Sequence, residues 1–298
     1  MKIGIIGLGR MGNSIAWRAV QGGHEVVGYD RDMQARKEIE KFGAKAVTSI
    51  ADIAKECRII WLMVPAGKVV DEVIKQLTPH LRSNDIVIDG GNSFYKDSQR
   101  RELDLTKFDT YYLDCGTSGG LEGRNIGFSL MVGGCQPAYD TIVPLLESLA
   151  APNGYGYMGQ SGSGHYVKMV HNGIEYALLQ SLGDGFNLLK NGPVKDLDLK
   201  KVSRVWSNGS VIRSWLMDLS HNIFEKDQNF DTISGAIGGG ETGRWTTQTA
   251  KEANISVPMI EQALKIRDWS IITGGNYATK LVAMLRNQFG GHTVKKIH

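Results

Sequence analysis

Short, nearly continuous runs of apolar residues alternate with helical patterns in the first half of the chain. Alternation of this kind is typical of a parallel sheet whose two faces are both covered by helices. Strands are predicted at 2–7, 25–30, 58–64, 85–91, 110–117 and 128–134. Helices are predicted between several of them, at 10–22, 32–42 and 67–78. The first half is therefore expected to be an α/β domain.

The pattern changes after the glycine-rich stretch 151–164. From Ser163 onward, apolar residues recur with helical spacing and strand-like runs are almost absent. Helices are predicted at 164–190, 197–224, 245–254, 257–273 and 276–289. We therefore expect two domains, an α/β domain over residues 1–162 and an all-α domain over residues 163–298.

Composition narrows the class of protein without identifying it. The 298 residues suffice for two domains, and 42% hydrophobic with 22% charged residues is ordinary for a soluble globular protein. No apolar run reaches the roughly 18 residues of a membrane span, and the glycine-interrupted N-terminus is unlike a signal peptide. A dispersed net charge of +3 does not indicate nucleic-acid binding. Cys57, Cys115 and Cys135 lack metal-ligand spacing and indicate free thiols in the cytoplasm, with no metal site expected.

Gly7, Gly9 and Gly12 form a G-x-G-x-x-G pattern between a predicted strand and a predicted helix. The glycines allow a tight turn and close approach of a pyrophosphate, to which the helix N-terminus presents amide groups. Asp30 ends the next predicted strand, where its carboxylate would accept hydrogen bonds from the adenosine ribose and favour NAD. Arg31 could contact a 2′-phosphate, so NADP stays open. The domain is thus predicted to be a Rossmann-type doubly wound sheet, with the cofactor against Gly7, Leu8, Gly9, Arg10, Met11, Gly12, Asp30 and Arg31.

Two later segments follow predicted strands, at the sheet edge where ligands bind in such folds. Val64, Pro65 and Ala66 follow one strand, and Asn92 follows the next. Asn92 offers an amide donor and an acceptor near the expected nicotinamide ribose. Each segment taken alone could also be an ordinary turn.

Polar residues gather on one face of the predicted helix 164–190. Lys168, His171, Asn172 and Glu175 fall at i, i+3, i+4 and i+7, and with Tyr176 they share an arc of roughly 140°. A lysine acts as a base only where burial and nearby positive charge lower its pKa. A solvated helix lysine is the alternative interpretation.

Six short motifs occur in order along the chain: GLGRMG, DGGNS, GTSGG, VKMVHNGIEY, GETGRWT and RNQFGGH. They occur in the order found in 6-phosphogluconate dehydrogenases, so the chain resembles that family, within the β-hydroxyacid dehydrogenase superfamily, over nearly its whole length. It is shorter than the familiar members and resembles their short, often NAD-preferring branch. The resemblance implies oxidative decarboxylation of 6-phosphogluconate to ribulose 5-phosphate, a step of the pentose phosphate pathway, with NAD or NADP. The alternatives are a dehydrogenase of small unphosphorylated 3-hydroxy acids and a non-catalytic NAD-binding protein.

The resemblance also implies roles for individual residues. Lys168 would remove the proton of the substrate C3 hydroxyl and then polarise the resulting carbonyl, and Glu175 would protonate C1 of the enediol. The carboxylate and hydroxyls would be held by Asn92, Ser118, Gly119, Gly120, His171 and Asn172. The phosphate would be held by Tyr176, Arg244, Arg267 and Arg286, since guanidinium groups bind two phosphate oxygens at once.

Two expectations concern segments of the second domain. The stretch 235–243 is expected to be a mobile loop that carries Arg244 over the substrate. The tail from Arg286 to His292 is implied by the resemblance to reach into the active site of a neighbouring subunit. A homodimer or homotetramer is therefore expected.

Overall fold

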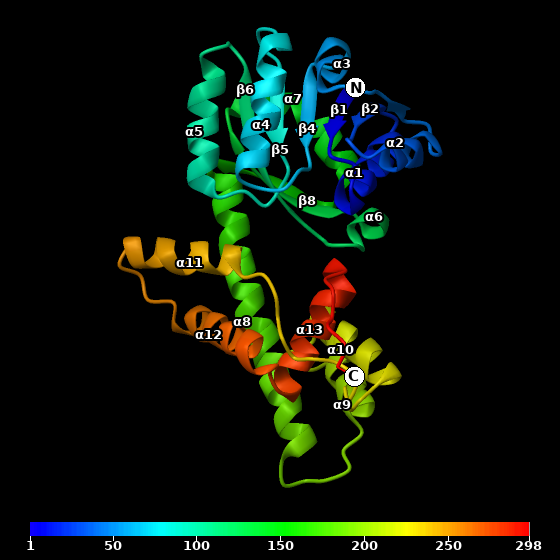
Figure 1. Cartoon of the computed structure of the whole chain (residues 1–298), viewed down its shortest axis with the longest axis vertical. Coiled ribbons are helices and arrows are strands. Elements are labelled where there is room, and N and C mark those ends of the chain that lie inside the picture. The colour runs from blue at the N-terminus through cyan, green and yellow to red at the C-terminus, as the bar shows by residue number, and fades with distance from the viewer. Residues whose placement is uncertain (298) are drawn as a thin grey trace. The chain divides into compact units, whose positions relative to one another are not determined.

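A computed structural model describes residues 1–297 and divides the chain into two compact units, Met1–Val170 and the part from His171 onward. The first unit holds a mostly parallel sheet with helices, and the second is helical (Figure 1). The predicted fold class is therefore confirmed. The predicted domain boundary after residue 162 stays a prediction, since helix α8 (Ser163–Asn191) contributes residues to both units.

The sheet of the first unit has the strand order β3-β2-β1-β4-β5-β6-β7-β8. Strands β1 to β6 are parallel, whereas β7 pairs antiparallel with β6, and β8 pairs parallel with β7. The predicted parallel sheet is therefore confirmed for β1 to β6, and the antiparallel pairing of β7 with β6 is an addition at its edge. The strands are β1 (Lys2–Ile6), β2 (Glu25–Tyr29), β3 (Lys45–Ala46), β4 (Ile59–Leu62), β5 (Ile86–Asp89), β6 (Tyr111–Ser118), β7 (Phe128–Gly134) and β8 (Ala150–Gly159).

Strand β8 lies in the glycine-rich stretch where no strand was predicted. Its glycines hide the strand pattern, but pairing with β7 supplies hydrogen-bond partners for the backbone. Tyr157 donates a hydrogen bond to the carbonyl of Gly134 at 2.8 Å, and its ring lies 5.2 Å from that of Tyr139. A long-range partner therefore creates this strand.

Helices cover both faces of the sheet, as the apolar strands predict. Trp61 belongs to the hydrophobic cluster on one face, while its neighbours Ile60 and Leu62 belong to the cluster on the other. The helices are α1 (Arg10–Gln21), α2 (Met33–Glu40), α3 (Ile50–Glu56), α4 (Lys68–Leu77), a 3₁₀ turn (Thr78–His80), α5 (Tyr95–Thr106), α6 (Gly123–Ile126) and α7 (Gln136–Leu149).

The second unit packs its helices around a core that includes Phe186, Phe224 and Phe230. The single helix predicted over 197–224 is wrong, because Gly209 adopts a φ of 85° and Ser214 caps a new helix by accepting from the amide of Met217. The helices are α8, α9 (Leu199–Ser207), α10 (Trp215–Lys226), α11 (Glu241–Glu252), α12 (Pro258–Thr273) and α13 (Tyr277–Gly290). Across residues 1–297, no helix has the length and apolar character needed to cross a membrane.

Candidate functional site

The turn between β1 and α1 has the backbone geometry that a dinucleotide requires. Gly7 has a φ of 92°, and a Cβ on Gly12 would overlap the Gly7 carbonyl. A Cβ on Gly9 would meet no atom within 4 Å, so the turn is open on that side. Within residues 1–297, no side chain caps the N-terminus of α1. The turn therefore fits a pyrophosphate that approaches the helix amides.

Asp30 lies at the edge of this turn, directly after β2. Its Oδ2 accepts the amide of Leu8 at 2.7 Å, and its Oδ1 accepts the amide of Asp32 at 2.8 Å. The carboxylate is thereby held against the glycine turn, while the neighbouring Arg31 is exposed. This geometry places a fixed negative charge beside the turn predicted to bind the cofactor.

The turns after β4 and β5 lie beside the glycine turn. A Cβ on Gly7 would lie 3.0 Å from Cγ1 of Val64, and a Cβ on Gly91 would lie 3.2 Å from the carbonyl oxygen of Val64. The adjoining residues Pro65 and Asn92 are exposed. The structure therefore brings together the predicted cofactor segments 7–12, 64–66 and 92 at one edge of the sheet.

Lys168 is buried against β6, the strand that ends in the second glycine-rich turn. Its side chain packs directly on the Gly116 backbone. Any side chain at position 116 would clash with it, because a Cβ there would overlap the Lys168 Cβ and lie 3.0 Å from its Cγ. Only 6% of Lys168 is exposed. Ser118 ends β6, and Gly119 and Gly120 follow with φ values of 126° and 55°. Lys168 is thus a buried helix lysine rather than a solvated one.

Helix α8 carries the other polar residues predicted for its face. Nδ1 of His171 lies 3.1 Å from Oδ1 of Asn172, which is buried. Glu175 is half-buried, and Tyr176 is 9% exposed. The helix runs unbroken from Ser163 to Asn191, so the predicted spacing from Lys168 to Glu175 holds.

Arg267 and Tyr176 form the centre of a cationic cluster in the second unit. The Arg267 guanidinium lies 3.6 Å from the centroid of the Tyr176 ring, at the distance of a cation–π contact. Arg267 is 2% exposed, and its Nη1 has no hydrogen-bond partner in the described part of the chain. Burial lowers the pKa of Arg267. A buried guanidinium with an unused donor suits an anionic ligand.

Two further arginines adjoin this pair. Nη1 of Arg286, on α13, donates to the carbonyl of Gly238 at 2.8 Å. Burial and the charge of Arg267 lower the pKa of Arg286 to about 10. Arg244 is about half exposed, and its Nη2 lies 2.6 Å from Oδ1 of Asp268. Arg244, Arg267 and Arg286 are hereafter called the arginine cluster.

The glycine-rich segment before α11 is anchored by hydrogen bonds. Residues 234–240 are irregular, but the amide of Gly235 donates to the carbonyl of Gly274 at 2.8 Å. The amide of Ile237 donates to Oγ of Ser270 at 3.0 Å, and the Ile237 side chain is buried. Arg244 lies in the first turn of α11 and so extends from a helix rather than from the loop itself. The expected movement of this segment over the substrate stays a prediction.

The tail contributes to the cluster of its own chain through Arg286. His292 follows α13, where its carbonyl accepts a hydrogen bond from Nδ2 of Asn287 at 2.8 Å. Its ring lies edge-on to Phe289, with centroids 6.5 Å apart. The predicted reach of this tail into a neighbouring subunit stays a prediction.

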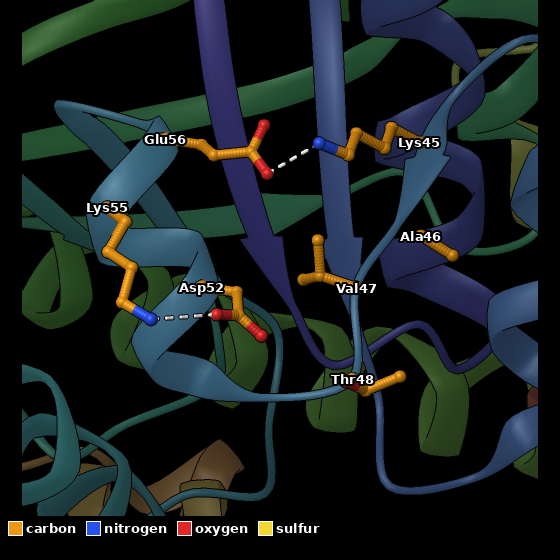
Figure 2. Close-up of a pocket in the computed structure, with 7 residues that line it drawn as sticks. All are labelled: Lys45, Ala46, Val47, Thr48, Asp52, Lys55 and Glu56. Carbon is orange, nitrogen blue, oxygen red and sulfur yellow. Dashed lines mark hydrogen bonds and ion pairs between the residues drawn. The ribbon is translucent and has the colours of Figure 1, made fainter.

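A cavity of about 330 Å³ lies beside β3 (Figure 2). Its charges are paired: Lys45 with Glu56 at 2.6 Å and Lys55 with Asp52 at 3.1 Å. The cavity therefore offers no ready counter-charge for an ionic ligand.

Three acidic residues that support the candidate site were not predicted from the sequence. Asp89 ends β5, and Asp114 lies within β6, both fully buried, while Asp268 pairs with Arg244. An acid inside or at the end of an apolar strand signals a buried hydrogen-bond network, which would have pointed to the first two. Asp268 stands among ordinary helix positions and carries no such signal.

Comparison with known proteins agrees with these features. Residues 2–168 match the NAD binding domain of 6-phosphogluconate dehydrogenase, and residues 164–288 match the 6-phosphogluconate dehydrogenase C-terminal domain. The chain is 46% identical to the NAD(+)-dependent, decarboxylating 6-phosphogluconate dehydrogenase of Haloferax volcanii, with 99% of each chain covered.

Solved structures agree as well. The 6-phosphogluconate dehydrogenase of Plasmodium falciparum has a TM-score of 0.84 at 32% identity, covering 91% of this chain and 62% of that longer one. The 3-hydroxyisobutyrate dehydrogenase of Mycobacterium tuberculosis, at 18% identity and a TM-score of 0.74, covers 94% of this chain and 97% of its own, and shares the fold. The chain belongs to the 6-phosphogluconate dehydrogenase family.

Proposed function

We propose that this protein catalyses the oxidative decarboxylation of 6-phosphogluconate to ribulose 5-phosphate and CO₂, with NAD as the preferred oxidant. The observation that carries the proposal is the buried guanidinium of Arg267, stacked on Tyr176 with an unused donor. An unphosphorylated 3-hydroxy acid would leave the arginine cluster without an anion to neutralise it. The full-length similarity to the Haloferax volcanii enzyme supports the same conclusion.

The chain's own residues supply the acid–base chemistry, while NAD accepts the hydride from C3. Lys168, which is 6% exposed, takes the proton of the C3 hydroxyl as the general base. Once protonated, Lys168 donates a hydrogen bond to the new carbonyl and stabilises the negative charge that develops as CO₂ leaves. Glu175 then delivers a proton to C1 of the enediol.

The remaining residues bind and orient the substrate. Ser118, with the amides of Gly119 and Gly120, holds the carboxylate, because successive backbone donors form an anion-binding turn. Asn92, His171 and Asn172 contact the hydroxyls. Tyr176 and the arginine cluster hold the phosphate, and His292 is proposed to close the far end of the substrate.

The preference for NAD rests on the carboxylate of Asp30. Its hydrogen bond from the Leu8 amide fixes a negative charge beside the glycine turn. That charge accepts hydrogen bonds from ribose hydroxyls and repels a 2′-phosphate. Arg31 is exposed and offers a contact to a 2′-phosphate, so activity with NADP is expected but lower than with NAD.

The proposed assembly is a homo-oligomer. Ile174, Leu178 and Leu188 of α8 are all more than half exposed, and their spacing places them on one side of the helix. An exposed apolar stripe of this kind suits packing against a second copy. A cytoplasmic location is proposed because Cys57, Cys115 and Cys135 are free thiols.

The proposal is tested by initial-rate assays of 6-phosphogluconate with NAD and NADP side by side. We expect NADH formation with one CO₂ released per NADH, and a higher kcat/KM with NAD. Oxidation of an unphosphorylated 3-hydroxy acid without CO₂ release would support the alternative dehydrogenase. Binding of NAD in calorimetry with no turnover of either substrate would leave only a nucleotide-binding protein.

A further inference from the structure

The side chain of Arg101 joins the two turns at the carboxyl ends of β4 and β5. It belongs to α5 and is 1% exposed. Its Nη2 donates to the carbonyl of Gly67 at 3.0 Å, and its Nη1 lies 3.2 Å from Oδ2 of Asp89. Its Nε donates to Oδ1 of Asp71 on α4 at 2.8 Å. One guanidinium therefore holds three acceptors from separate elements.

Asp89 extends this link into the turn that carries Asn92. Its Oδ1 accepts the amide of Gly91 at 3.1 Å, and its Oδ2 accepts the hydroxyl of Ser93 at 2.7 Å. Asp89 is fully buried, so these hydrogen bonds are made in a region without competing water. The residues on both sides of Asn92 are thus fixed to the carboxylate that Arg101 holds.

The charge of Arg101 is well compensated at this position. Burial by itself would lower the pKa of Arg101. The hydrogen bond to Asp71 and the charge of Asp89 stabilise the charged guanidinium, so its pKa is raised above the usual value. A lysine could not make the same set of contacts, because its single ammonium lacks the planar fork that reaches three acceptors. The network therefore depends on arginine in particular.

We propose that Arg101 is a positioning residue that sets the turn ending at Gly67 against the turn carrying Asn92, and so shapes the nicotinamide end of the cofactor site. This rests on the proposed cofactor site, in which Val64–Ala66 and Asn92 contact NAD. Arg101 acts on one turn through the Gly67 carbonyl and on the other through the Asp89 carboxylate, which accepts the Gly91 amide. The glycine turn and Asp30, which would hold the adenosine half, lie outside its contacts.

The test compares Arg101→Lys with Arg100→Lys in the full-length protein. Arg100 is the neighbouring residue of α5, is half exposed and also pairs with Asp71, at 2.9 Å, but has no recorded contact with Gly67 or Asp89 among the described residues. Calorimetry would measure the affinity for NADH and for ADP, which lacks the nicotinamide half. We expect Arg101→Lys to weaken NADH binding about tenfold, the loss typical of one hydrogen bond to a charged group, and ADP binding less than about twofold.

Steady-state kinetics supply the second readout. The KM for NAD should rise in parallel in Arg101→Lys. The KM for 6-phosphogluconate should rise less, because Asn92 is only one of the residues proposed to hold the substrate hydroxyls, and Arg100→Lys should match the parent. Equal weakening of NADH and ADP, or unchanged NADH binding, would overturn the inference. A parent protein that binds no NADH or shows no turnover would instead reject the proposed function.

A second variant keeps the inference testable if Arg101→Lys does not fold. Ser93→Ala removes one donor to Asp89 and leaves Arg101 in place. It should weaken NADH binding about threefold without affecting ADP, since a single hydrogen bond within an intact network is lost. NADH affinity equal to that of the parent would contradict the inference.

Discussion

Nη2 of Arg244 lies 2.6 Å from Oδ1 of Asp268, so this arginine already has an anionic partner within its own unit. Arg267 and Arg286, by contrast, are held by an aromatic ring and a carbonyl. In the proposed reaction, the substrate phosphate competes with Asp268 for Arg244. Asp268 then limits the contribution of Arg244 to substrate affinity.

Asp268→Asn should therefore lower the KM for 6-phosphogluconate about two- to fivefold, since exposed ion pairs are worth up to about 1 kcal/mol. The kcat and the KM for NAD should stay unchanged. Asp231→Asn, at an exposed position of the same unit, is the matched control. A higher KM in Asp268→Asn would mean that Asp268 positions Arg244 rather than competing for it.

Lys168→Ala should reduce kcat about a thousandfold, the range expected for loss of a general base. NADH affinity should change by less than about threefold, because Lys168, on α8 against Gly116 of β6, is assigned to proton transfer rather than to cofactor binding. Lys190→Ala on the same helix, where Nζ bonds Asn229 at 2.6 Å, serves as the control. Equal losses of turnover and cofactor affinity would argue against a catalytic role.

Asp30→Ser should raise the KM for NAD about tenfold and improve the use of NADP, because the fixed carboxylate beside the Leu8 amide is removed. Asp32→Ser is the matched control, since Asp32 caps α2 by accepting from Gln34 and makes no recorded contact with the glycine turn within residues 1–297. Rates with both cofactors would be compared at saturating 6-phosphogluconate. An unchanged preference in Asp30→Ser would contradict the assignment.

Inorganic phosphate should raise the melting temperature by roughly 5 °C at about a hundredfold excess over its Kd. The pKa of Arg286, about 10, lies below its unfolded value because burial and Arg267 disfavour the charged form. Charged Arg286 is therefore fully destabilising at every pH below about 10, and the penalty falls progressively as the pH rises from this value towards the higher pKa of the unfolded chain. At neutral pH a bound anion relieves the penalty instead.

Arg286→Gln should remove about half of the phosphate-induced rise in melting temperature, because the variant lacks one of the cationic groups proposed to bind the anion. Chloride at equal ionic strength should have little effect, and Arg204→Gln, at an exposed position of α9, should behave like the parent. If phosphate raised the melting temperature of Arg286→Gln and of the parent equally, Arg286 would not be a ligand of the anion.

Asp114→Asn should destabilise the first unit by about 2 kcal/mol, because it breaks one of a buried pair of hydrogen bonds and leaves an amide donor unpaired. Oδ1 and Oδ2 of Asp114 accept the amides of Gly162 and His165, each at 2.7 Å, at the N-terminus of α8. An asparagine would point an NH₂ group at one of these amides. Urea unfolding would measure the change, with Asp109→Asn as an exposed control whose positive φ suits asparagine. Equal midpoints for the two variants would show that the cap is not needed.

Local patterns in the sequence were enough to predict the features that depend on neighbouring residues. The glycine turn, Asp30 at a strand end and the spacing of Lys168, His171, Asn172 and Glu175 follow from the periods of strand and helix. The apolar strands likewise predicted a sheet covered on both faces. The edge strand β8 and the break between α9 and α10 were not predicted, because the first depends on pairing with β7 and the second on the conformation of Gly209 and the cap at Ser214.

Tertiary structure alone decided which charges meet. Arg101 reaches Gly67 and Asp89, Asp114 caps α8, and Asp268 pairs with Arg244, each across a separation that no helical or strand period spans. The sequence by itself determined the family, the order of the elements and the residues suited to the chemistry. Packing decided which of those residues are buried and what holds them, because burial and ion pairing depend on distances in space rather than along the chain.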